Sequence, residues 1–269
     1  MRLTLGGGTR LVGLIGDPVD HSLSPLMQNA GFAALALDWA YVPLPVARDR
    51  LEEAVAGLVA LGFVGANVTI PHKTAVVSFC DELDDVAGRA GSVNTLVVQD
   101  GRVLGSSTDG PAVTGLVEAA GARVLLLGAG GGAQAVATSV LDAGAAELVI
   151  GVRNLERGQA LAARLRTLFP DREIHTEELP PTTSEATLVI DATPEVERAL
   201  VEVTEKQQIV DLAYKPDGSD TALIAAARRA GCERVVDGLS VLLAQGAASF
   251  ERWTGLEAPV DVMAAALSR

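Results

Sequence analysis

The sequence predicts an α/β protein of two domains. Strand-like and helix-like patterns alternate along nearly all of its 269 residues, which is typical of parallel α/β folds. The sequence pattern changes after about residue 110, where a fully apolar strand and a glycine-rich turn follow. The chain has no internal repeat, low-complexity tract or long linker, and its length suits two domains of moderate size.

The first elements follow from short apolar runs and the residues that flank them. A strand that ends in glycine is predicted at RLVGLIG (10–16). A helix is predicted at 24–37, with Ser24 as its N-cap and Pro25 at its first helical position, where proline is favoured. We then expect a strand at 39–46.

Three further elements complete the first domain. A helix is expected at 48–62, and a strand at 63–70. Residues 94–108 alternate between apolar and polar around Asp100-Gly101, a turn pair that predicts a β-hairpin.

The second part of the chain repeats a strand–helix pattern. Residues 123–144 contain an apolar strand, a glycine turn and a long helix. Further short apolar strands are expected at 147–152, 186–193, 207–214 and 234–238, separated by helical stretches, and two helices at 239–255 and 260–269. The predicted domains are therefore 1–110, completed by 239–269, and 111–238.

Composition limits the classes of function. The formal net charge of −13 argues against nucleic acid, which needs a basic face, and gives no overall attraction to an anionic ligand. No run reaches the roughly 18 apolar residues of a membrane span, and the N-terminus lacks the apolar core of a signal peptide. We expect a cytoplasmic protein, monomeric or homodimeric, without a nucleic-acid or membrane partner.

The glycine turn predicts a dinucleotide site. Gly128-x-Gly130-x-x-Ala133 stands directly after a strand and opens a helix. The first glycine permits a tight turn, the second lets a pyrophosphate approach the backbone, and the small alanine lets the helix pack on the strand. The free N–H groups of the helix N-terminus would bind the phosphates. The alternative is a tight turn with no ligand.

The next strand favours NADP over NAD. An NAD site would normally place an acidic residue at the end of this strand, where the chain has Val152-Arg153. Arg153 and Arg157 lie four apart, so both can project from one side of the following helix start. Two guanidinium groups suit a 2′-phosphate, although a solvated helix start would also explain them.

Lys73 is the predicted acid–base residue of the first domain. The chain has 21 basic residues, of which only three (73, 206 and 215) are lysines. Unlike arginine, lysine can release its proton when its surroundings lower its pKa. Reduction of a ketone by hydride requires a positioned acid, and Lys73 follows a strand end, where open α/β sheets bind ligands. We expect Asp109 to be the carboxylate partner of Lys73. The alternative is that Lys73 is a surface charge at the start of a helix.

Six motifs in order resemble one family. GDPVDHSLSP, GANVTIPHK, AGSVNTL, GSSTDG, GAGGGA and DGLSVLLAQGA have the order and spacing found in shikimate dehydrogenases, and they span nearly the whole chain. The resemblance implies an N-terminal α/β substrate domain, a C-terminal Rossmann-like NADP-binding domain, and C-terminal helices that pack back on the N-terminal domain. It implies reversible NADPH-dependent reduction of 3-dehydroshikimate to shikimate, a step of aromatic amino acid and chorismate biosynthesis.

The resemblance also assigns residues by motif. Lys73 stands at the motif position of the family's proton donor and acceptor, and Asp109 stands at the position of its hydrogen-bonded partner. The implied substrate-binding residues are Ser22 and Ser24 for the carboxylate, Thr69, Asn94, Asp109 and Gln245 for ring hydroxyls, and Tyr214 to close the pocket. The implied cofactor-binding residues are Gly128, Ala129, Gly130, Gly131, Gly132, Val152, Arg153, Asn154, Arg157, Leu212 and Gly238. Taken singly, Ser22 and Ser24 would also serve as helix caps.

No metal is expected. His21 and His72 lie within two of these motifs, and His175 is the only other histidine, which leaves no cluster of histidine ligands. Cys80 and Cys232 have no metal-ligand spacing and are too few for a disulfide framework.

The cofactor side departs from the family pattern. Val152-Arg153-Asn154 stands where Asn-Arg-Thr is usual, and Asp191 replaces an asparagine in a segment that also lacks a later Gly-Met pair. Ser107 replaces another asparagine. These changes keep open an NAD-preferring quinate/shikimate dehydrogenase and a non-catalytic shikimate-binding relative. A folate-type dehydrogenase shares the two-domain plan, but HSLSP and the STDG carboxylate favour a hydroxylated ring acid.

Overall fold

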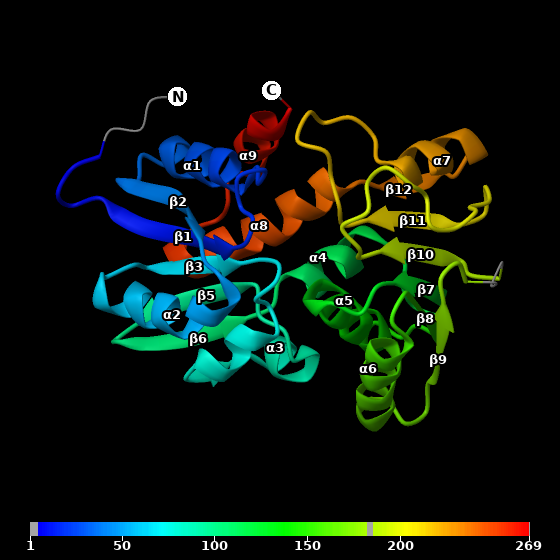
Figure 1. Ribbon diagram of the computed structural model, residues 1–269. Coiled ribbons are helices and arrows are strands. Elements are labelled where there is room, and N and C mark those ends of the chain that lie inside the picture. Colours follow the sequence, from blue (N-terminus) through cyan, green and yellow to red (C-terminus); the bar gives the residue numbers. More distant parts are fainter. Residues whose placement is uncertain (1–4, 182–184, 269) are drawn as a thin grey trace. The chain divides into compact units, whose positions relative to one another are not determined.

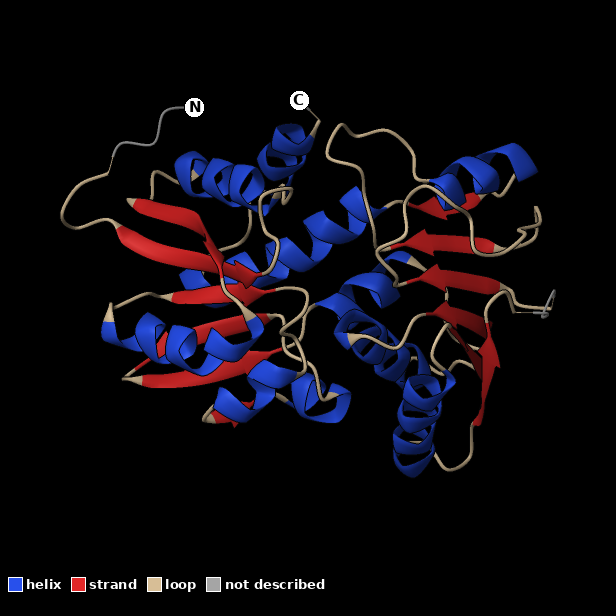
Figure 2. Ribbon diagram, viewed as in Figure 1, coloured by secondary structure: helices blue, strands red, loops and turns tan. Residues whose placement is uncertain are grey.

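The computed structural model describes residues 5–181 and 185–268 and divides into two compact units. The first unit contains the chain up to Thr108 and again from Leu243 onward, and the second runs from Asp109 to Leu242. Figures 1 and 2 show that each unit has helices packed on a central sheet. No helix in the described ranges is long and apolar enough to cross a bilayer.

The first unit has a mixed sheet in the order β2-β1-β3-β5-β6-β4. Its strands are β1 (Arg10–Gly16), β2 (Trp39–Pro45), β3 (Gly65–Val68), β4 (Glu82–Leu83), β5 (Thr95–Gln99) and β6 (Arg102–Ser106). Its helices are α1 (Ser24–Ala34), η1 (Arg48–Arg50), α2 (Leu51–Ala60), η2 (Ala75–Phe79), α3 (Asp85–Ala90), most of α8 (Gly238–Thr254), and α9 (Val260–Leu267). β1 is parallel to β2 and β3, whereas β5 is antiparallel to β3 and β6.

The two faces of this sheet are covered by different helices (Figure 1). On one face, Ile15, Ala66 and Leu96 pack with apolar residues of α2, η2 and α3. The other face lies under α1 and α8, where Trp253 donates its indole N–H to the carbonyl of Leu96 at 2.9 Å. α9 packs against α1, so the C-terminal helices complete the N-terminal unit as the resemblance predicts.

The hairpin prediction is confirmed. β5 and β6 pair through Gln99 and Arg102, and the two residues between them have φ of +53° at Asp100 and +76° at Gly101. Positive φ at both central positions is what a two-residue type I′ turn requires, and it explains the Asp-Gly pair.

The second unit has a parallel sheet in the order β12-β11-β10-β7-β8-β9. Its strands are β7 (Arg123–Leu127), β8 (Glu147–Val152), β9 (Glu173–Glu178), β10 (Leu188–Asp191), β11 (Gln208–Asp211) and β12 (Arg234–Val236). Its helices are α4 (Asp109–Leu116), α5 (Gly131–Asp142), α6 (Leu155–Leu168) and α7 (Ala222–Ala230). The order is that of the Rossmann fold, with its reversal between β7 and β10.

The helices of the second unit also divide between two faces. α5 and α6 bury Val136, Val140 and Leu161 on one face, and α7 buries Leu223 and Ala227 on the other (Figure 1). Helices on both faces leave the carboxyl edge at the β7–β10 reversal as the place where such folds bind ligands.

The structure differs from the sequence predictions at the start of α1 and at the edge strand β9. Ser24 is the first residue of α1 rather than its N-cap; the cap position is Leu23, whose side chain makes no capping hydrogen bond. β9 was not predicted, because its sequence EIHTEE is charged and only Ile174 is deeply buried. An edge strand with one polar face lacks the apolar run that revealed β7 and β8.

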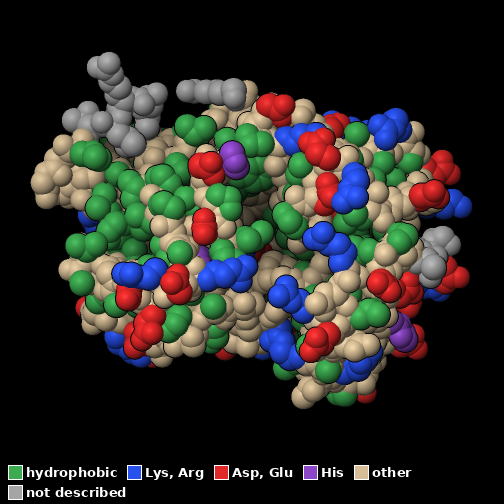
Figure 3. All heavy atoms as spheres, in the orientation of Figure 1, with side chains coloured by type: hydrophobic (Ala, Val, Ile, Leu, Met, Phe, Trp, Pro, Cys, Tyr) green, Lys and Arg blue, Asp and Glu red, His purple; other side chains and the backbone are tan. Residues whose placement is uncertain are grey.

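The face of the molecule in Figure 3 carries charges of both signs. On the described part of the face in Figure 3, acidic and basic side chains are interspersed, and no continuous basic stripe is seen. Hydrophobic side chains gather over part of the first unit.

Candidate active site

Strand ends of the first unit bring the predicted substrate residues to one edge of the sheet. Ser22 and Ser24 follow β1, and Thr69 and Lys73 follow its parallel neighbour β3. Because β5 is antiparallel to β3, Asn94 at the start of β5 lies at the same edge. The register of these strands thus gathers residues that are far apart in the sequence.

The serines and the lysine are held through their backbones. Ser24 is buried, and its N–H donates to the hydroxyl of Ser22 at 3.2 Å. Lys73 is half-buried, and its carbonyl accepts from the N–H of Val93 at 2.8 Å. His72 is 1% exposed, and a ring nitrogen lies 2.7 Å from the carbonyl oxygen of Val46. This contact connects the loop after β3 to the residue that follows β2.

Asn94 and Gln245 are in direct contact. The Asn94 amide nitrogen donates to Gln245 Oε1 at 3.2 Å and to Thr108 Oγ1 at 2.8 Å. The backbone N–H of Thr108 can only donate, and it reaches Asn94 Oδ1 at 2.8 Å, which fixes the orientation of the Asn94 amide. Asp109, the next residue, is buried and begins α4.

The glycine turn of the second unit has the geometry that its sequence predicts. Gly128 follows β7 with φ of +107°, a conformation that favours glycine, and an added Cβ would lie 3.3 Å from the carbonyl oxygen of Ala192. Gly130 is the N-cap of α5 and has no side chain to cap it, so the first N–H groups of this 12-residue helix are left to other acceptors. Ala129, Gly131 and Gly132 are half-buried around the turn.

The end of β8 presents two arginines. Val152 is buried, whereas Arg153 and Arg157 are exposed, and no ion pair of either with a carboxylate is found within the described residues. Asn154 is the N-cap of α6, because its Oδ1 accepts from the N–H of Arg157 at 3.0 Å. The side chain of Asn154 therefore helps to start the helix that carries Arg157.

Two carboxyl groups are buried at the ends of β10 and β11. Asp191 and Asp211 are in register and are 1% and 0% exposed. Burial raises the pKa of Asp191 to about 6, against the hydrogen bonds that it accepts from Thr193. Burial, together with the smaller effect of the Asp191 charge, raises the pKa of Asp211 to about 7. The two carboxyl groups therefore form a buried acidic pair at adjacent strand ends.

The loop after β11 holds the remaining predicted residues. Leu212 and Tyr214 are half-buried, and Gly238 is buried at the start of α8. An added Cβ on Gly238 would meet the carbonyl oxygen of Ala213, so only glycine allows this approach. Tyr214 and Gly238 line a small cavity of about 20 Å³ with Asp237 and Thr221.

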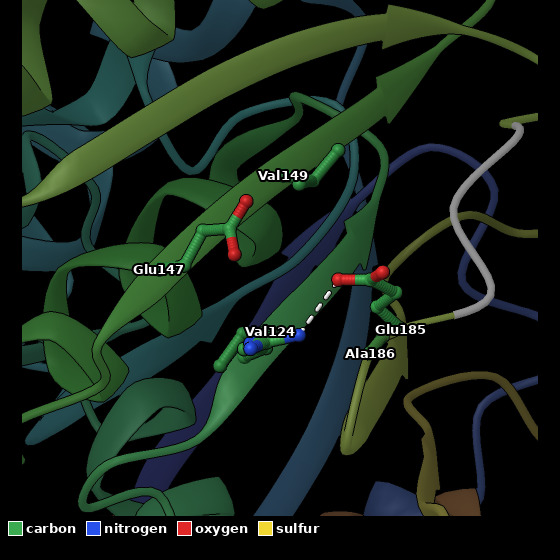
Figure 4. Close-up of a pocket in the computed structure, with 6 residues that line it drawn as sticks. Val124, Glu147, Val149, Glu185 and Ala186 are labelled. Carbon is green, nitrogen blue, oxygen red and sulfur yellow. Dashed lines mark hydrogen bonds and ion pairs between the residues drawn. The ribbon is translucent and has the colours of Figure 1, made fainter.

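Another cavity lies away from these residues. Figure 4 shows its lining at the amino ends of β7 and β8, where Arg123 pairs with Glu185 at 2.7 Å beside Glu147. Its volume is about 40 Å³, and it lies opposite the carboxyl edge where this fold binds ligands. Nearby, ligand atoms of Glu147, Glu173 and His175 lie within 4.8 Å of one another. The sequence did not reveal this cluster, because the register of β8 and β9 creates it.

Family models match three segments of the chain. The shikimate dehydrogenase substrate binding domain matches residues 14–96, shikimate / quinate 5-dehydrogenase matches 112–221, and the shikimate 5′-dehydrogenase C-terminal domain matches 238–267. The shikimate dehydrogenase (NADP(+)) of Moorella thermoacetica is 44% identical over 272 residues, covering 95% of this chain and 91% of that protein. The chain belongs to the shikimate dehydrogenase family.

Solved structures of this family agree with the fold. A shikimate dehydrogenase in complex with NADP+ is 32% identical, with a TM-score of 0.89 over 98% of this chain and 96% of that one. The quinate dehydrogenase from Corynebacterium glutamicum in complex with NAD is 29% identical, with a TM-score of 0.83 over 96% and 98% of the two chains. The predicted family and α/β fold are confirmed, whereas the roles of individual residues stay predictions.

Proposed function

We propose that this chain catalyses the reversible, NADPH-dependent reduction of 3-dehydroshikimate to shikimate. The observation that carries the proposal is the match at 44% identity, across 95% of this chain, to a shikimate dehydrogenase (NADP(+)). The chain would then be an oxidoreductase of aromatic amino acid biosynthesis, with a small hydroxylated acid as its substrate.

The second unit has groups that fit a dinucleotide phosphate. The turn from Gly128 to Gly132 and the uncapped start of α5 supply backbone N–H donors and a positive helix dipole to a pyrophosphate. Arg153 and Arg157 supply two exposed guanidinium groups for a 2′-phosphate. Val152, Asn154, Leu212 and Gly238 would line the rest of the cofactor site.

The first unit would bind the substrate through neutral groups. The hydroxyls of Ser22 and Ser24 suit a carboxylate, since hydroxyls donate hydrogen bonds without adding charge. Thr69, Asn94 and Gln245 suit ring hydroxyls, and Tyr214 would close the pocket. A protein with a net charge of −13 must hold an anion by such local donors.

Lys73 would exchange the proton. When bound, NADPH would supply the hydride for the carbonyl carbon of the substrate, and the carbonyl oxygen would then need a proton. The Lys73 ammonium donates a proton to that oxygen, and in the reverse direction its neutral amine accepts the hydroxyl proton. Asp109, buried at the start of α4, would hold the Lys73 ammonium in place by a hydrogen bond.

A second candidate is an NAD-preferring quinate/shikimate dehydrogenase. This candidate rests on the altered segment that begins at Asp191, since the next residue, Ala192, lies against the glycine turn at Gly128. The third candidate is a shikimate-binding relative without turnover.

The test is an absorbance assay in the reduced-nicotinamide band with four pairings, shikimate or quinate with NADP or NAD. We expect a rise chiefly with shikimate and NADP. A rise chiefly with NAD, or with quinate, would favour the second candidate. No rise in any pairing, together with tight calorimetric binding of shikimate, would favour the third and contradict the proposal.

A further inference from the structure

Two buried hydroxyl groups connect the elements that carry Asn94 and Gln245. Thr95 on β5 and Ser249 on α8 are both 0% exposed, and their hydroxyl oxygens lie 2.8 Å apart. Thr95 directly follows Asn94, and Ser249 lies one helical turn after Gln245. The pair therefore joins a strand to a helix that is 154 residues away in the sequence.

The hydrogen bonds of this pair end on Asn94 and Gln245. Thr95 Oγ1 lies 3.2 Å from Asn94 Oδ1, and Ser249 Oγ donates to the backbone carbonyl oxygen of Gln245 at 3.0 Å. Two arrangements of the hydroxyl hydrogens fit these distances. In one, Ser249 donates to the Gln245 backbone carbonyl and Thr95 donates to Ser249. In the other, Ser249 donates to Thr95 and Thr95 donates to Asn94 Oδ1. Both arrangements use every hydroxyl hydrogen, so the pair is satisfied without water.

The buried side chains of Asn67 and Tyr41 extend this network. The Asn67 amide nitrogen donates to Ser249 Oγ at 3.0 Å and to the carbonyl oxygen of Asn94 at 3.0 Å. Its Oδ1 accepts from the Tyr41 hydroxyl at 2.8 Å. These side chains point to the α8 face of the sheet, opposite the apolar face that holds Leu96. A fully satisfied buried network of this kind rigidifies the groups that it joins.

We propose that Thr95 and Ser249 are positioning residues that hold the Asn94 amide, and through its contact with Asn94 the Gln245 amide, in the place that binds the substrate hydroxyls. The inference rests on the proposed function and adds two residues that none of the six motifs identified as part of the site. An amide can present either its oxygen or its nitrogen to a ligand, so its recognition of a hydroxyl depends on which way it is held. The Thr108 N–H fixes which Asn94 atom is the oxygen, and the Thr95 hydroxyl adds a second contact to that oxygen. Ser249 holds the backbone of Gln245, whose amide accepts from Asn94.

The same network reaches the predicted catalytic residues through the backbone. Asn94 Oδ1 accepts from the N–H of Thr108, the residue before Asp109. The residue before Asn94, Val93, donates its N–H to the carbonyl of Lys73 at 2.8 Å. A disturbed Asn94 would thus affect substrate binding first and the placement of the two ionisable residues second.

The test compares Thr95→Val with Thr95→Ser. Valine keeps the shape of threonine without its hydroxyl, whereas serine keeps the hydroxyl. We expect Thr95→Val to raise the KM for shikimate about 10-fold, the worth of one buried hydrogen bond, and Thr95→Ser to stay near wild type. The KM for NADP should change in neither variant.

A double-variant cycle tests whether the hydroxyls act as a pair. Ser249→Ala should raise the KM for shikimate as Thr95→Val does, and the double variant should lose little more than either single variant. Thr138→Val in α5 is the matched control, because its hydroxyl is equally buried and donates to the carbonyl of Gln134 at 2.9 Å. It should lower the melting temperature without moving the KM for shikimate.

Three outcomes would overturn the inference. The first is an unchanged KM for shikimate in Thr95→Val despite a lower melting temperature. The second is an equal rise of this KM in Thr95→Val and Thr95→Ser. The third is a rise in the double variant that equals the combined effects of the two single variants. Calorimetry with shikimate separates this inference from the proposed function. If wild type binds shikimate without turnover, the proposed function fails and the dissociation constants of the variants still decide the positioning role. If wild type does not bind shikimate, both fail.

Discussion

Replacement of Asp191 by asparagine should stabilise the protein at neutral and alkaline pH. Asp191 is 1% exposed at the end of β10, where it faces the equally buried Asp211, and burial raises its pKa from 3.8 to about 6. The folded protein therefore holds this proton more tightly than the unfolded chain does. Stability falls as the pH rises from about 4 to about 6 and then levels off. Asparagine keeps the oxygen that accepts from Thr193 and has no charge to bury.

The size of the effect follows from the shift in pKa. At pH 8 the difference between about 6 in the folded protein and 3.8 in the unfolded chain corresponds to about 3 kcal/mol. At about pH 4 the carboxyl group is mostly neutral in the folded protein and only partly ionised in the unfolded chain, so the gain falls below about 1 kcal/mol. For a protein of this size, 3 kcal/mol corresponds to a rise in Tm of roughly 6 to 12 °C.

Calorimetric unfolding of Asp191→Asn and wild type between about pH 4 and pH 8 measures this dependence. Asp217→Asn is the matched control, because Asp217 accepts from the N–H of Ser219 in the same kind of turn but is exposed, and these hydrogen bonds lower its pKa. The control should show no gain at high pH. A gain for Asp191→Asn that is equal at both ends of the pH range, or no gain at pH 8, would refute the reasoning.

Three further predictions test other parts of the molecule. Lys73→Ala should cut kcat by about 10² to 10⁴ with little change in shikimate binding, the usual effect of losing a general acid–base group, whereas Lys206→Ala on the surface should change neither; a kcat within a few-fold of wild type would return Lys73 to a surface charge. Arg153→Ala should raise the KM for NADP about 10- to 100-fold and leave the KM for NAD nearly unchanged, and equal losses for both would contradict a 2′-phosphate role. Gly110→Ala should lower Tm strongly, because its Cβ would meet Ser139 and the carbonyl oxygen of Ala135 across α4 and α5, whereas Gly115→Ala on the same helix meets nothing within 4 Å and should be neutral or stabilising; similar changes in Tm for both would argue against close packing of the helices.

Local sequence patterns predicted most of the fold. β1, β7 and β8 have apolar runs that mark them, and the hairpin has an Asp-Gly pair whose positive φ values demand those residues. β9 and the two-residue β4 could not be found in this way, because an edge strand or a very short strand need bury no apolar run. The start of α1 was misplaced by one residue, since Ser22 and Ser24 are both good caps in sequence, and only the backbone shows that Leu23 occupies the cap position.

The site was predictable where a motif is contiguous and hidden where register creates it. The glycine turn and Asn154 behave as local sequence rules require, as a tight turn and a helix cap. The Thr95–Ser249 contact joins positions 154 residues apart; Thr95 lies in the AGSVNTL motif, but nothing local in the sequence shows that its hydroxyl meets Ser249. The raised pKa of Asp191 likewise depends on the burial of two adjacent strand ends, which only the sheet order reveals.

The divided first unit also has a consequence for synthesis of the protein on the ribosome. Residues up to Thr108 emerge early, but most of α8 and all of α9, which complete their unit, emerge only after the second unit. At typical translation rates the second unit, 109–242, takes roughly 7 to 27 s to emerge, and it can fold as it appears. During that interval the face of the sheet that Trp253 and Ser249 later cover is exposed to solvent. The incomplete N-terminal unit is therefore the species in which a chaperone would have the most apolar surface to shield.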